Sequence, residues 1–143
     1  YPYRLEAGTL NLLGIFALAA GIDYLEKEDV MLEGHRREMA LTRRLYDGLS
    51  SLPGVIIHSP PPTIGGGPVL TCSIKGMASA DVGDILDGDY QIAVRTGLHC
   101  APLVHESLGT AIGGAVRFSP GRFNTEGDID RALEAMATIS AKS

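Results

Sequence analysis

The chain has 143 residues, of which 45% are hydrophobic and 20% are charged, and its formal net charge is −5 at pH 7. This length and composition predict a folded, soluble chain with one substantial core. The negative net charge and the mixing of both signs along the chain argue against a surface for nucleic acid or for an anionic membrane.

The first long apolar run, from Leu10 to Ile22, predicts a buried helix with Thr9 as its N-cap. The run is about 13 residues long, whereas a membrane-spanning helix needs about 20. It lacks the basic start and cleavage site of a signal peptide. The chain begins at Tyr1 without a methionine, which indicates a processed chain or a piece of a longer one.

An amphipathic helix should follow, because apolar residues recur at steps of three and four from Leu32 to Leu49. Val55–His58 is a short apolar run typical of a strand that is buried on both faces. The stretch from Ser59 to Pro68 is rich in proline and glycine, which predicts an irregular loop. Val69–Ile74 should be a second strand, with Cys72 in the core.

Further helices and strands are expected in the second half of the chain. Ala80–Leu86 predicts a short helix with Ser79 as its N-cap, and Tyr90–Val94 alternates as a strand does. The strand Ala115–Ser119 and a final helix capped by Thr125 complete the pattern. Four strands and about four helices predict a two-layer α+β domain.

The segment from Arg95 to Pro102 is where we expect chemistry. Gly97 allows a sharp bend, and Pro102 suits the first turn of a helix over Leu103–Leu108. Cys100 would then lie on a loop that enters a helix, with Arg95 and His99 as cationic neighbours, and these surroundings favour a thiolate. The alternative is that Cys100 is a small buried apolar residue.

The second cysteine, Cys72, has no Cys-x-x-Cys relation to Cys100. A disulfide framework or a structural zinc site is therefore not indicated, and a reducing compartment is expected, for which we choose the cytoplasm. Arg117 interrupts an apolar strand, where its guanidinium suits bidentate capture of a carboxylate. The alternative for Arg117 is an edge-strand arginine in water.

Several ordered motifs carry a resemblance to a known family. They are Glu6-Ala7-Gly8-Thr9, then Arg95-Thr96-Gly97-Leu98-His99-Cys100-Ala101, Gly109-Thr110, Val116-Arg117-Phe118-Ser119 and Phe123-Asn124-Thr125 with Asp128 and Asp130. This set resembles the C-terminal third of the class V aminotransferases, in the branch of the cysteine desulfurases and selenocysteine lyases. The fold implied is the two-layer small domain of a fold-type-I pyridoxal-phosphate enzyme, with a small mixed or antiparallel sheet covered by helices.

The resemblance implies a role for each matching residue. Cys100 would be the nucleophile that takes sulfur as a persulfide, and His99 would assist it. Arg117 would bind the substrate carboxylate, and Arg95 would support the substrate end of the site. Thr9 would reach the pyridoxal-phosphate phosphate of the partner subunit across a dimer, and Gly8 would also belong to the cofactor-binding residues. The substrate would be L-cysteine or L-selenocysteine, the parent would be a homodimer, and a sulfur-acceptor protein could serve iron–sulfur cluster assembly.

The sequence also departs from this family. Leu98 stands where the best-known members of the branch often have a second histidine, and Ala101 is directly followed by Pro102. These differences leave the substrate and the sulfur acceptor open. His105 could replace the missing imidazole from the first turn of the following helix, or it could be a surface residue.

The chain has three lysines, Lys27, Lys75 and Lys142, and none stands in the context of the family's Schiff-base lysine. We therefore expect residues 1–25 to lead from an absent large domain and residues 26–143 to form the C-terminal small domain, inactive alone. Two alternatives are a freestanding thiol or metal module that uses Cys100, His99, His105 and Cys72, and a non-catalytic dimerisation or interaction domain. No metal site is expected within the favoured hypothesis.

Overall fold

The structure, a computed structural model, describes residues 4, 8–27, 30–63 and 66–142. The chain divides into two compact units, Tyr1–Gly34 and His35–Ser143, which are described separately. The motif residues Glu6 and Ala7 lie outside the described residues.

The first unit contains helix α1, Leu12–Leu25. Its N-cap is Asn11, whose side chain accepts a hydrogen bond from the Gly14 N–H at 3.0 Å, so the expected cap at Thr9 is wrong. The expected burial is also wrong within this chain, since no α1 residue is buried. The apolar residues favour a helix, and their side chains are exposed in the first unit. None of the helices in the described ranges combines the length and the hydropathy of a membrane-spanning segment.

Helix α2, Val30–Ser50, continues into the second unit, whose other elements follow in chain order. They are β1 (Val55–Ile57), β2 (Leu70–Ile74), α3 (Ser79–Tyr90), β3 (Arg95–Gly97), α4 (Pro102–Ser107), β4 (Ala115–Phe118) and α5 (Glu126–Ser140). The four strands form one antiparallel sheet in the order β1-β2-β4-β3. The α+β class and the four-stranded sheet are as the sequence predicts.

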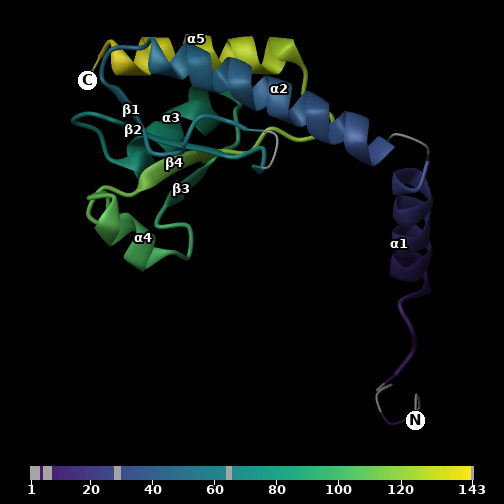
Figure 1. The fold of residues 1–143 in the computed structure, drawn as a ribbon. Helices are drawn as coiled ribbons and strands as arrows, with labels where there is room; N and C mark the ends of the chain where they lie inside the picture. The colour runs from purple at the N-terminus through teal and green to yellow at the C-terminus, as the bar shows by residue number, and fades with distance from the viewer. Residues whose placement is uncertain (1–3, 5–7, 28–29, 64–65, 143) are drawn as a thin grey trace. The chain divides into compact units, whose positions relative to one another are not determined.

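Helices α2, α3 and α5 cover one face of this sheet, and α2 and α5 lie side by side above it (Figure 1). The core between them is made by alternate strand residues and by the apolar faces of the helices. Its fully buried large side chains include Leu45, Leu49, Leu70, Leu86 and Met136. Cys72 belongs to this core, as predicted.

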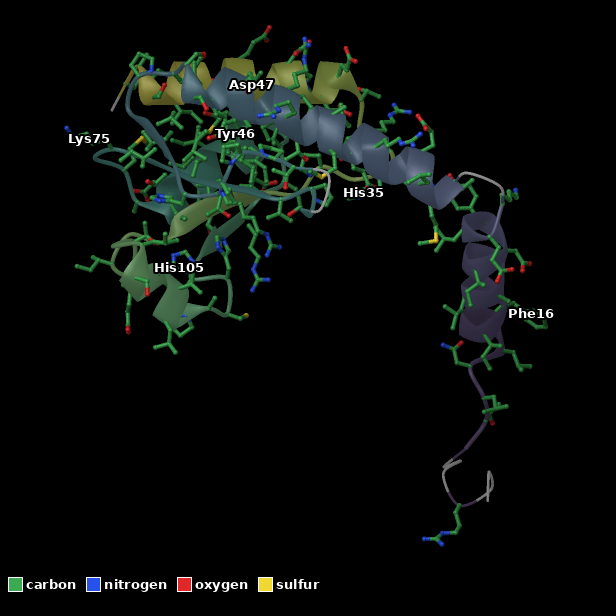
Figure 2. The ribbon with its side chains drawn as sticks, viewed as in Figure 1. Phe16, His35, Tyr46, Asp47, Lys75 and His105 are labelled. Carbon is green, nitrogen blue, oxygen red and sulfur yellow. The ribbon has the colours of Figure 1, made fainter. Side chains whose placement is uncertain are left out.

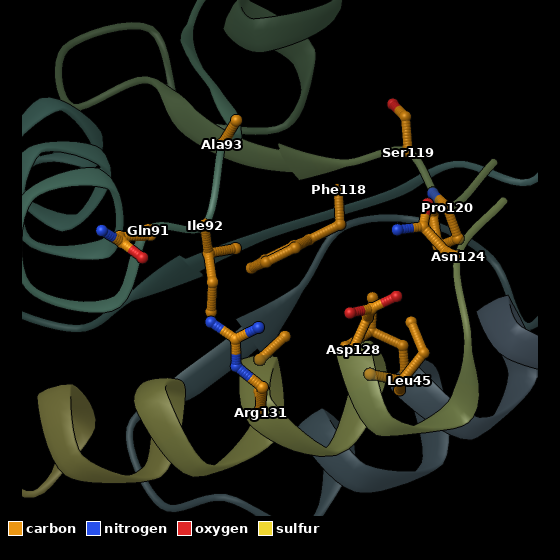
Figure 3. A pocket seen from close by; sticks show the side chains of 12 residues that line it. Leu45, Gln91, Ile92, Ala93, Phe118, Ser119, Pro120, Asn124, Asp128 and Arg131 are labelled. Atoms are coloured by element: carbon orange, nitrogen blue, oxygen red, sulfur yellow. The ribbon is translucent and has the colours of Figure 1, made fainter.

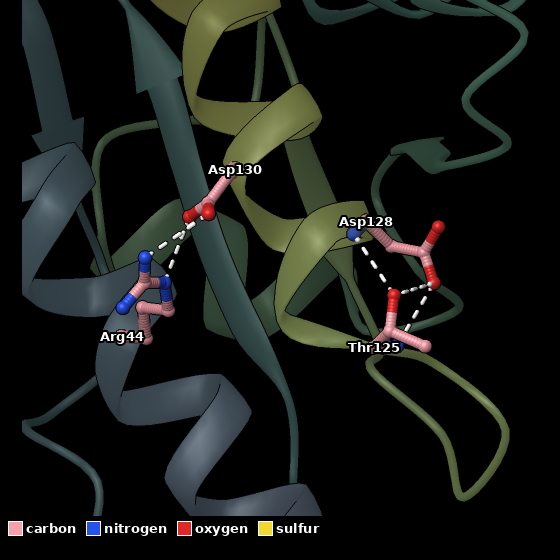
Figure 4. Close-up of polar contacts among 4 residues, drawn as sticks. All are labelled: Arg44, Thr125, Asp128 and Asp130. Atoms are coloured by element: carbon pink, nitrogen blue, oxygen red, sulfur yellow. Dashed lines mark hydrogen bonds and ion pairs between the residues drawn. The ribbon is translucent and has the colours of Figure 1, made fainter.

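Two contacts draw α2 and α5 together. A side chain at Gly48 would clash with Leu133, so glycine allows the close approach of the two helices. Arg44 also donates from Nε and from a terminal guanidinium nitrogen to the two carboxylate oxygens of Asp130, at 2.8 and 3.0 Å (Figure 4). The bidentate geometry fixes the register of the pair.

The cap of α5 is formed as predicted. The Thr125 hydroxyl accepts from the Asp128 N–H at 3.3 Å, and an Asp128 carboxylate oxygen accepts from the Thr125 N–H at 2.8 Å (Figure 4). This is a capping box with aspartate in the third helical position. The hydrogen bonds from the Thr125 backbone and hydroxyl lower the pKa of Asp128.

This lowered pKa gives a pH-dependent contribution to stability. A carboxyl whose folded-state pKa is depressed stabilises the fold above its ordinary value of 3.8, and the contribution disappears as the pH falls through the folded-state pKa. We expect Asp128→Asn to lower the free energy of unfolding near neutral pH, and we expect the difference from the unmodified protein to shrink at about pH 3. Urea unfolding at both pH values measures this. A difference that stays constant between them would contradict it.

Three local expectations are corrected by the structure. Tyr90–Val94 is not a strand, because α3 continues to Tyr90 and Gln91 then ends it in the left-handed conformation, with φ of 56°. The strand begins at Arg95, where the chain first pairs with β4. The β1 strand is at a sheet edge and only half-buried rather than buried on both faces. Ser79 is the first residue of α3 rather than its cap, which is Ala78.

A hollow of about 250 Å³ opens between α5 and the segment that links α3 to β3 (Figure 3). Ile92, Phe118 and Leu45 form its apolar part, while Asp128 and Arg131 line its polar side. Arg131 donates to the Tyr90 carbonyl at 3.1 Å, and Asp128 is committed to the helix cap. None of the sequence-predicted site residues lines this hollow.

Candidate functional site

The candidate site lies on the sheet face that α2, α3 and α5 do not cover. Strand side chains alternate between faces, and Val116 and Phe118 belong to the core, so Arg117 between them projects to the opposite face. Arg117 pairs in register with Thr71 on one side and with Arg95 on the other. Two arginine residues thus stand directly opposite on adjacent strands, and like charges in such a pair are unfavourable unless an anion lies beside them.

Beyond β3 the chain turns tightly over Leu98–Ala101. The Ala101 N–H donates to the Leu98 carbonyl at 2.8 Å, and the two central residues, His99 and Cys100, have φ of 52° and 60°. Positive φ at both central positions is the pattern of a type I′ turn, which glycine and asparagine favour. Each of these two residues is held there at a cost of about 1–2 kcal/mol. Such strain is typical of a functional position.

The strained turn presents the Cys100 thiol. Arg95 donates a hydrogen bond from a terminal guanidinium nitrogen to the Cys100 Sγ at 3.0 Å, and the Cys100 side chain is exposed. The alternative, that Cys100 is a small buried apolar residue, is therefore wrong. Helix α4 begins at Pro102 as predicted, but the partner that the structure gives to the sulfur is Arg95. A guanidinium at this distance stabilises negative charge on sulfur.

Cys72 has the opposite environment. It is buried on β2 within the core, and burial raises the pKa of its thiol to about 12. The thiolate is the nucleophilic form of cysteine. The chain therefore has one thiol suited to chemistry in the folded state, on Cys100.

The ring of His99 is held at the base of the same turn. Its Nε2 lies 3.2 Å from the Arg95 carbonyl oxygen. A carbonyl can only accept, so Nε2 carries the proton and Nδ1 is the basic nitrogen of the neutral ring. Burial, more than the nearby His105, Arg117 and Arg95, lowers the pKa of His99, although the bond to the Arg95 carbonyl raises it. His99 is thus suited to accept a proton near neutral pH.

The ring of His105 lies next to the ring of His99. It lies in the last turn of α4, not the first turn as expected, on the side that faces the sheet (Figure 2). Its side chain is 3% exposed, so the prediction of a surface residue is also wrong. Its Nδ1 lies 2.8 Å from the Thr110 Oγ1, and the centroid of its ring lies 5.3 Å from that of His99.

Arg117 is the one residue whose buried polar side-chain atom has no hydrogen-bond partner within the described part of the chain, and this atom is its Nε. A buried N–H of this kind is costly unless a ligand or a neighbouring segment satisfies it. The alternative of an edge-strand arginine is wrong, because β4 lies between β2 and β3.

Close backbone contacts fix β3 and the reactive turn on the rest of the sheet. Gly97 has φ of 93° and donates from its N–H to the Ser79 Oγ at 3.2 Å. Gly114 has φ of 63°, and a Cβ there would lie 2.6 Å from the Ser79 Oγ and 2.7 Å from the Gly97 Cα. The start of α3, the end of β3 and the start of β4 therefore meet at a point where only glycine fits.

The remaining predicted site residues, Gly8 and Thr9, lie in the first unit. Both are exposed, and nothing comes within 4 Å of a Cβ built on Gly8. In the part of the chain that the structure describes, no three His, Cys, Asp or Glu side chains are grouped so that they could hold a metal ion. The hypothesis of a metal module that uses Cys100, His99, His105 and Cys72 has no structural support.

Comparison with known proteins identifies the family. Residues 1–132 match the family model for aminotransferase class V. This chain belongs to the class V aminotransferase family. Its sequence is 34% identical over 141 residues to a probable cysteine desulfurase from Methanothermobacter thermautotrophicus. This match covers 98% of this chain and 34% of that relative. It is 36% identical over 139 residues to a cysteine desulfurase from Cronobacter sakazakii, covering 96% of this chain and 32% of the relative.

Solved structures agree with the fold. The apo cysteine desulfurase from Thermococcus onnurineus matches this class V chain with a TM-score of 0.85 and 35% identity, over 99% of this chain and 34% of that one. The cysteine desulfurase CsdA from Escherichia coli, in an S-sulfonic acid form, matches with a TM-score of 0.80 and 27% identity, over 99% and 33%. The chain therefore spans about a third of the length of its relatives.

Sequence reasoning brought Cys100, His99 and Arg95 together correctly as one segment of this class V chain. It did not find the contacts that Thr110, Ser79 and Gly114 make around this segment. Gly109 and Thr110 stood among the motif residues, but no local pattern shows that a threonine hydroxyl reaches a histidine ring across the end of a helix. The adjacent glycines Gly113 and Gly114 were the available signal for a close approach.

Proposed function

We propose that this chain is the C-terminal part of a pyridoxal-phosphate-dependent cysteine desulfurase-like enzyme, and that Cys100 is its nucleophile and persulfide carrier. One observation carries the proposal. An exposed thiol accepts a hydrogen bond from Arg95, and Arg95 stands opposite a second arginine, Arg117, whose buried Nε has no partner in the described chain. A nucleophilic sulfur beside a paired cationic site suits a substrate that carries both sulfur and a carboxylate.

The reaction transfers the sulfur atom of L-cysteine, or the selenium of L-selenocysteine. The Cys100 sulfur forms a new S–S or S–Se bond as the substrate carbon–sulfur or carbon–selenium bond breaks. The electron pair of the broken bond stays on carbon, which takes up a proton to become alanine. Pyridoxal phosphate, when bound, supplies the electron sink that makes this carbon a feasible leaving group.

The arginines would hold the substrate. The planar fork of Arg117 offers bidentate hydrogen bonds to the substrate carboxylate, and a rigid strand fixes its direction. Arg95 would relieve the repulsion between the two guanidinium groups by sharing the same anion, while it keeps its contact with the Cys100 sulfur. His99, with its basic Nδ1, would accept the proton that the sulfur must lose before it attacks.

The chain supplies only an edge of the cofactor site. The exposed Thr9 hydroxyl and the open backbone at Gly8 fit contacts to a phosphate group. A Schiff base requires a lysine, and none of Lys27, Lys75 and Lys142 stands in the family's context. The lysine would come from the part of the enzyme that corresponds to the remaining two thirds of its relatives.

The larger assembly follows from the same proposal. Residues 1–25 would lead from the large domain and residues 26–143 would form the small domain, in a homodimer. The apolar α1 side chains, such as Leu13 and Phe16, are exposed within this chain and would pack against the large domain. A reactive thiol of this kind suits a reducing compartment such as the cytoplasm. A sulfur-acceptor protein would take the persulfide sulfur toward iron–sulfur cluster assembly.

The test compares the full-length enzyme with this chain alone. We expect the full-length enzyme to release alanine from L-cysteine in the presence of a reductant, and the isolated chain to release none and to lack the cofactor absorbance near roughly 330–430 nm. Alanine release from neither cysteine nor selenocysteine by the full-length enzyme would overturn the proposal. It would favour a non-catalytic interaction domain.

Removing the Arg117 charge should selectively slow the reaction of Cys100 with a carboxylate-bearing reagent. Iodoacetate carries a carboxylate and iodoacetamide does not, so the ratio of their rate constants reports attraction of a carboxylate to the site. We expect Arg117→Met to lower this ratio by about threefold or more at low salt, since the charge lies close to a low-dielectric surface. Both rate constants are measured by quenching the alkylation at timed intervals and quantifying the modified Cys100 peptide by mass spectrometry.

The matched control is Arg43→Met. Arg43 lies on α2 and faces Asp47 at 3.9 Å, in the helical layer on the other side of the sheet. The Arg43→Met variant also removes one positive charge from the chain, and it should leave the ratio of the iodoacetate and iodoacetamide rate constants unchanged. An equal fall in both variants would show a general charge effect and would contradict the role of Arg117.

A further inference from the structure

A continuous set of contacts connects Thr110 with the reactive turn. The Thr110 Oγ1 lies 2.8 Å from the His105 Nδ1, and the rings of His105 and His99 meet at a tilt of 53°. The His99 Nε2 lies 3.2 Å from the carbonyl of Arg95, and Arg95 donates to the Cys100 Sγ at 3.0 Å. The two residues in each of these contacts are four to six positions apart in the sequence. The set is therefore formed by a local segment that folds back on itself.

The backbone around Thr110 is also fixed. Its N–H donates to the His105 carbonyl at 2.8 Å, and its carbonyl accepts from the Gly114 N–H at 2.8 Å. The His105 N–H in turn donates to the carbonyl of Ala101, which follows Cys100 directly, at 3.2 Å. Thr110 is buried, with 9% of its surface exposed. The hydroxyl therefore cannot exchange His105 for bulk water without a rearrangement of this segment.

We propose that Thr110 and His105 form a positioning pair for the site: the Thr110 hydroxyl fixes the His105 ring, and this ring holds His99 against Arg95 so that the guanidinium stays on the Cys100 sulfur. The importance of Cys100 in this proposal rests on the proposed function. The experiment that tests the positioning pair does not depend on that function. His105 acts through His99 and Arg95 and does not itself reach the reacting atoms.

The geometry favours this role over that of a core histidine. Leu, Ile or Phe would fill a buried position of α4 without the need for a polar partner, and a buried imidazole costs free energy unless its nitrogens are bonded. His105 meets this need through a hydroxyl that no helix or strand provides. Two non-glycine residues beside it are also held at positive φ, and this strain requires surroundings that over-determine the turn.

The test uses Thr110→Val, which keeps the shape of the side chain and removes the hydroxyl. We expect the rate constant for iodoacetamide alkylation of Cys100 in the 143-residue chain to fall about fivefold near neutral pH, the size of effect that loss of the bond to the His105 ring can have. The longer bond that the same hydroxyl donates to the His105 carbonyl, at 3.4 Å, is lost with it. Cys100 is already exposed, so a looser turn does not raise its access; it only weakens the Arg95 contact. Cys72 does not interfere, because burial holds it as a thiol. Cys100→Ser assigns the signal.

A spectroscopic readout separates positioning from stability. Long-range ¹H–¹⁵N spectra of the imidazoles should show a His99 ring protonated at Nε2 in the unmodified chain and an average of both tautomers in Thr110→Val. Thr110→Ser retains the hydroxyl and should restore both the tautomer and the rate. If Thr110→Val does not fold, His105→Phe keeps a ring beside His99 without the hydroxyl bond, and the same fall in rate is expected.

The matched control is Thr42→Val. Thr42 is also fully buried, and its hydroxyl donates to the Glu38 carbonyl at 2.8 Å, away from the site on α2. It should change stability without changing the Cys100 rate. A wild-type rate and an unchanged His99 tautomer in Thr110→Val, an equal fall in Thr42→Val, or no rescue by serine would each overturn the proposal. None of these readouts needs cofactor or substrate, so they stand whether or not the full-length enzyme releases alanine.

Discussion

Cys100→Ser in the full-length enzyme is expected to abolish the release of alanine from L-cysteine, with turnover lowered by about a thousandfold or more. A serine hydroxyl is a far weaker nucleophile than a thiol and cannot form a persulfide. Arg95 and Arg117 remain in place in this variant, so binding of the substrate carboxylate should be retained. The expected result is loss of turnover with little change in the affinity for L-cysteine, measured by alanine formation and by substrate titration.

The matched control for this prediction is Cys72→Ala. Cys72 is the other cysteine of the chain, and it lies in the core with its thiol pKa raised to about 12 by burial. Its loss should lower stability modestly and leave turnover within about twofold of the unmodified enzyme. Turnover that survives Cys100→Ser, or that falls equally in Cys72→Ala, would contradict the assignment of the persulfide to Cys100.

The fold was largely predictable because its strongest signals are local. The strand with Cys72, the capping box at Thr125 and the helix that begins at Pro102 depend on alternation, capping and fixed φ, which short windows of sequence contain. The strand over Tyr90–Val94 failed for a physical reason. Ile92 and Val94 alternate with more exposed residues because they pack against the core. Such alternation indicates which side chains are buried, but it does not show that the segment pairs with another strand.

Helix α1 shows a different limit. Its apolar residues correctly predict a helix, but the side chains of Leu13 and Phe16 on it are exposed rather than buried. Hydropathy alone cannot say which part of a protein supplies the other side of an interface. The match to about a third of each relative agrees with a partner surface elsewhere in the enzyme.

The candidate site was predictable as a segment but not as a constellation. Cys100, His99 and Arg95 are close in sequence, so the turn that joins them brings their side chains together. The register that places Arg117 opposite Arg95 depends on tertiary contacts. The bond between His105 and Thr110 is local, but no pattern of residue types predicts it. The positive φ of Cys100 is also invisible in its residue type, since cysteine has no preference for it.

Gly114→Ala is expected to destabilise the second unit, His35–Ser143, by about 3 kcal/mol and to lower its melting temperature by about 10 °C or more. The φ of Gly114 is 63°, and the added Cβ would lie 2.7 Å from the Gly97 Cα and 2.6 Å from the Ser79 Oγ. Backbone cannot move aside as a flexible side chain does, so β3 must shift relative to β4. Because Arg95 begins β3, its contact with the Cys100 sulfur should weaken, and alkylation of Cys100 should slow together with the loss of stability.

The neighbouring glycine separates this effect from a general cost of replacing glycine. Gly113→Ala adds the same methyl group where nothing lies within 4 Å, and it should change the melting temperature by no more than about 2 °C. Thermal unfolding of the two variants, with Cys100 alkylation measured well below both transitions, gives the comparison. Equal melting temperatures would mean that the close contact of Gly97 with Gly114 does not hold β3 in place, and that the reactive turn takes its position from α4 and the His105–Thr110 pair alone.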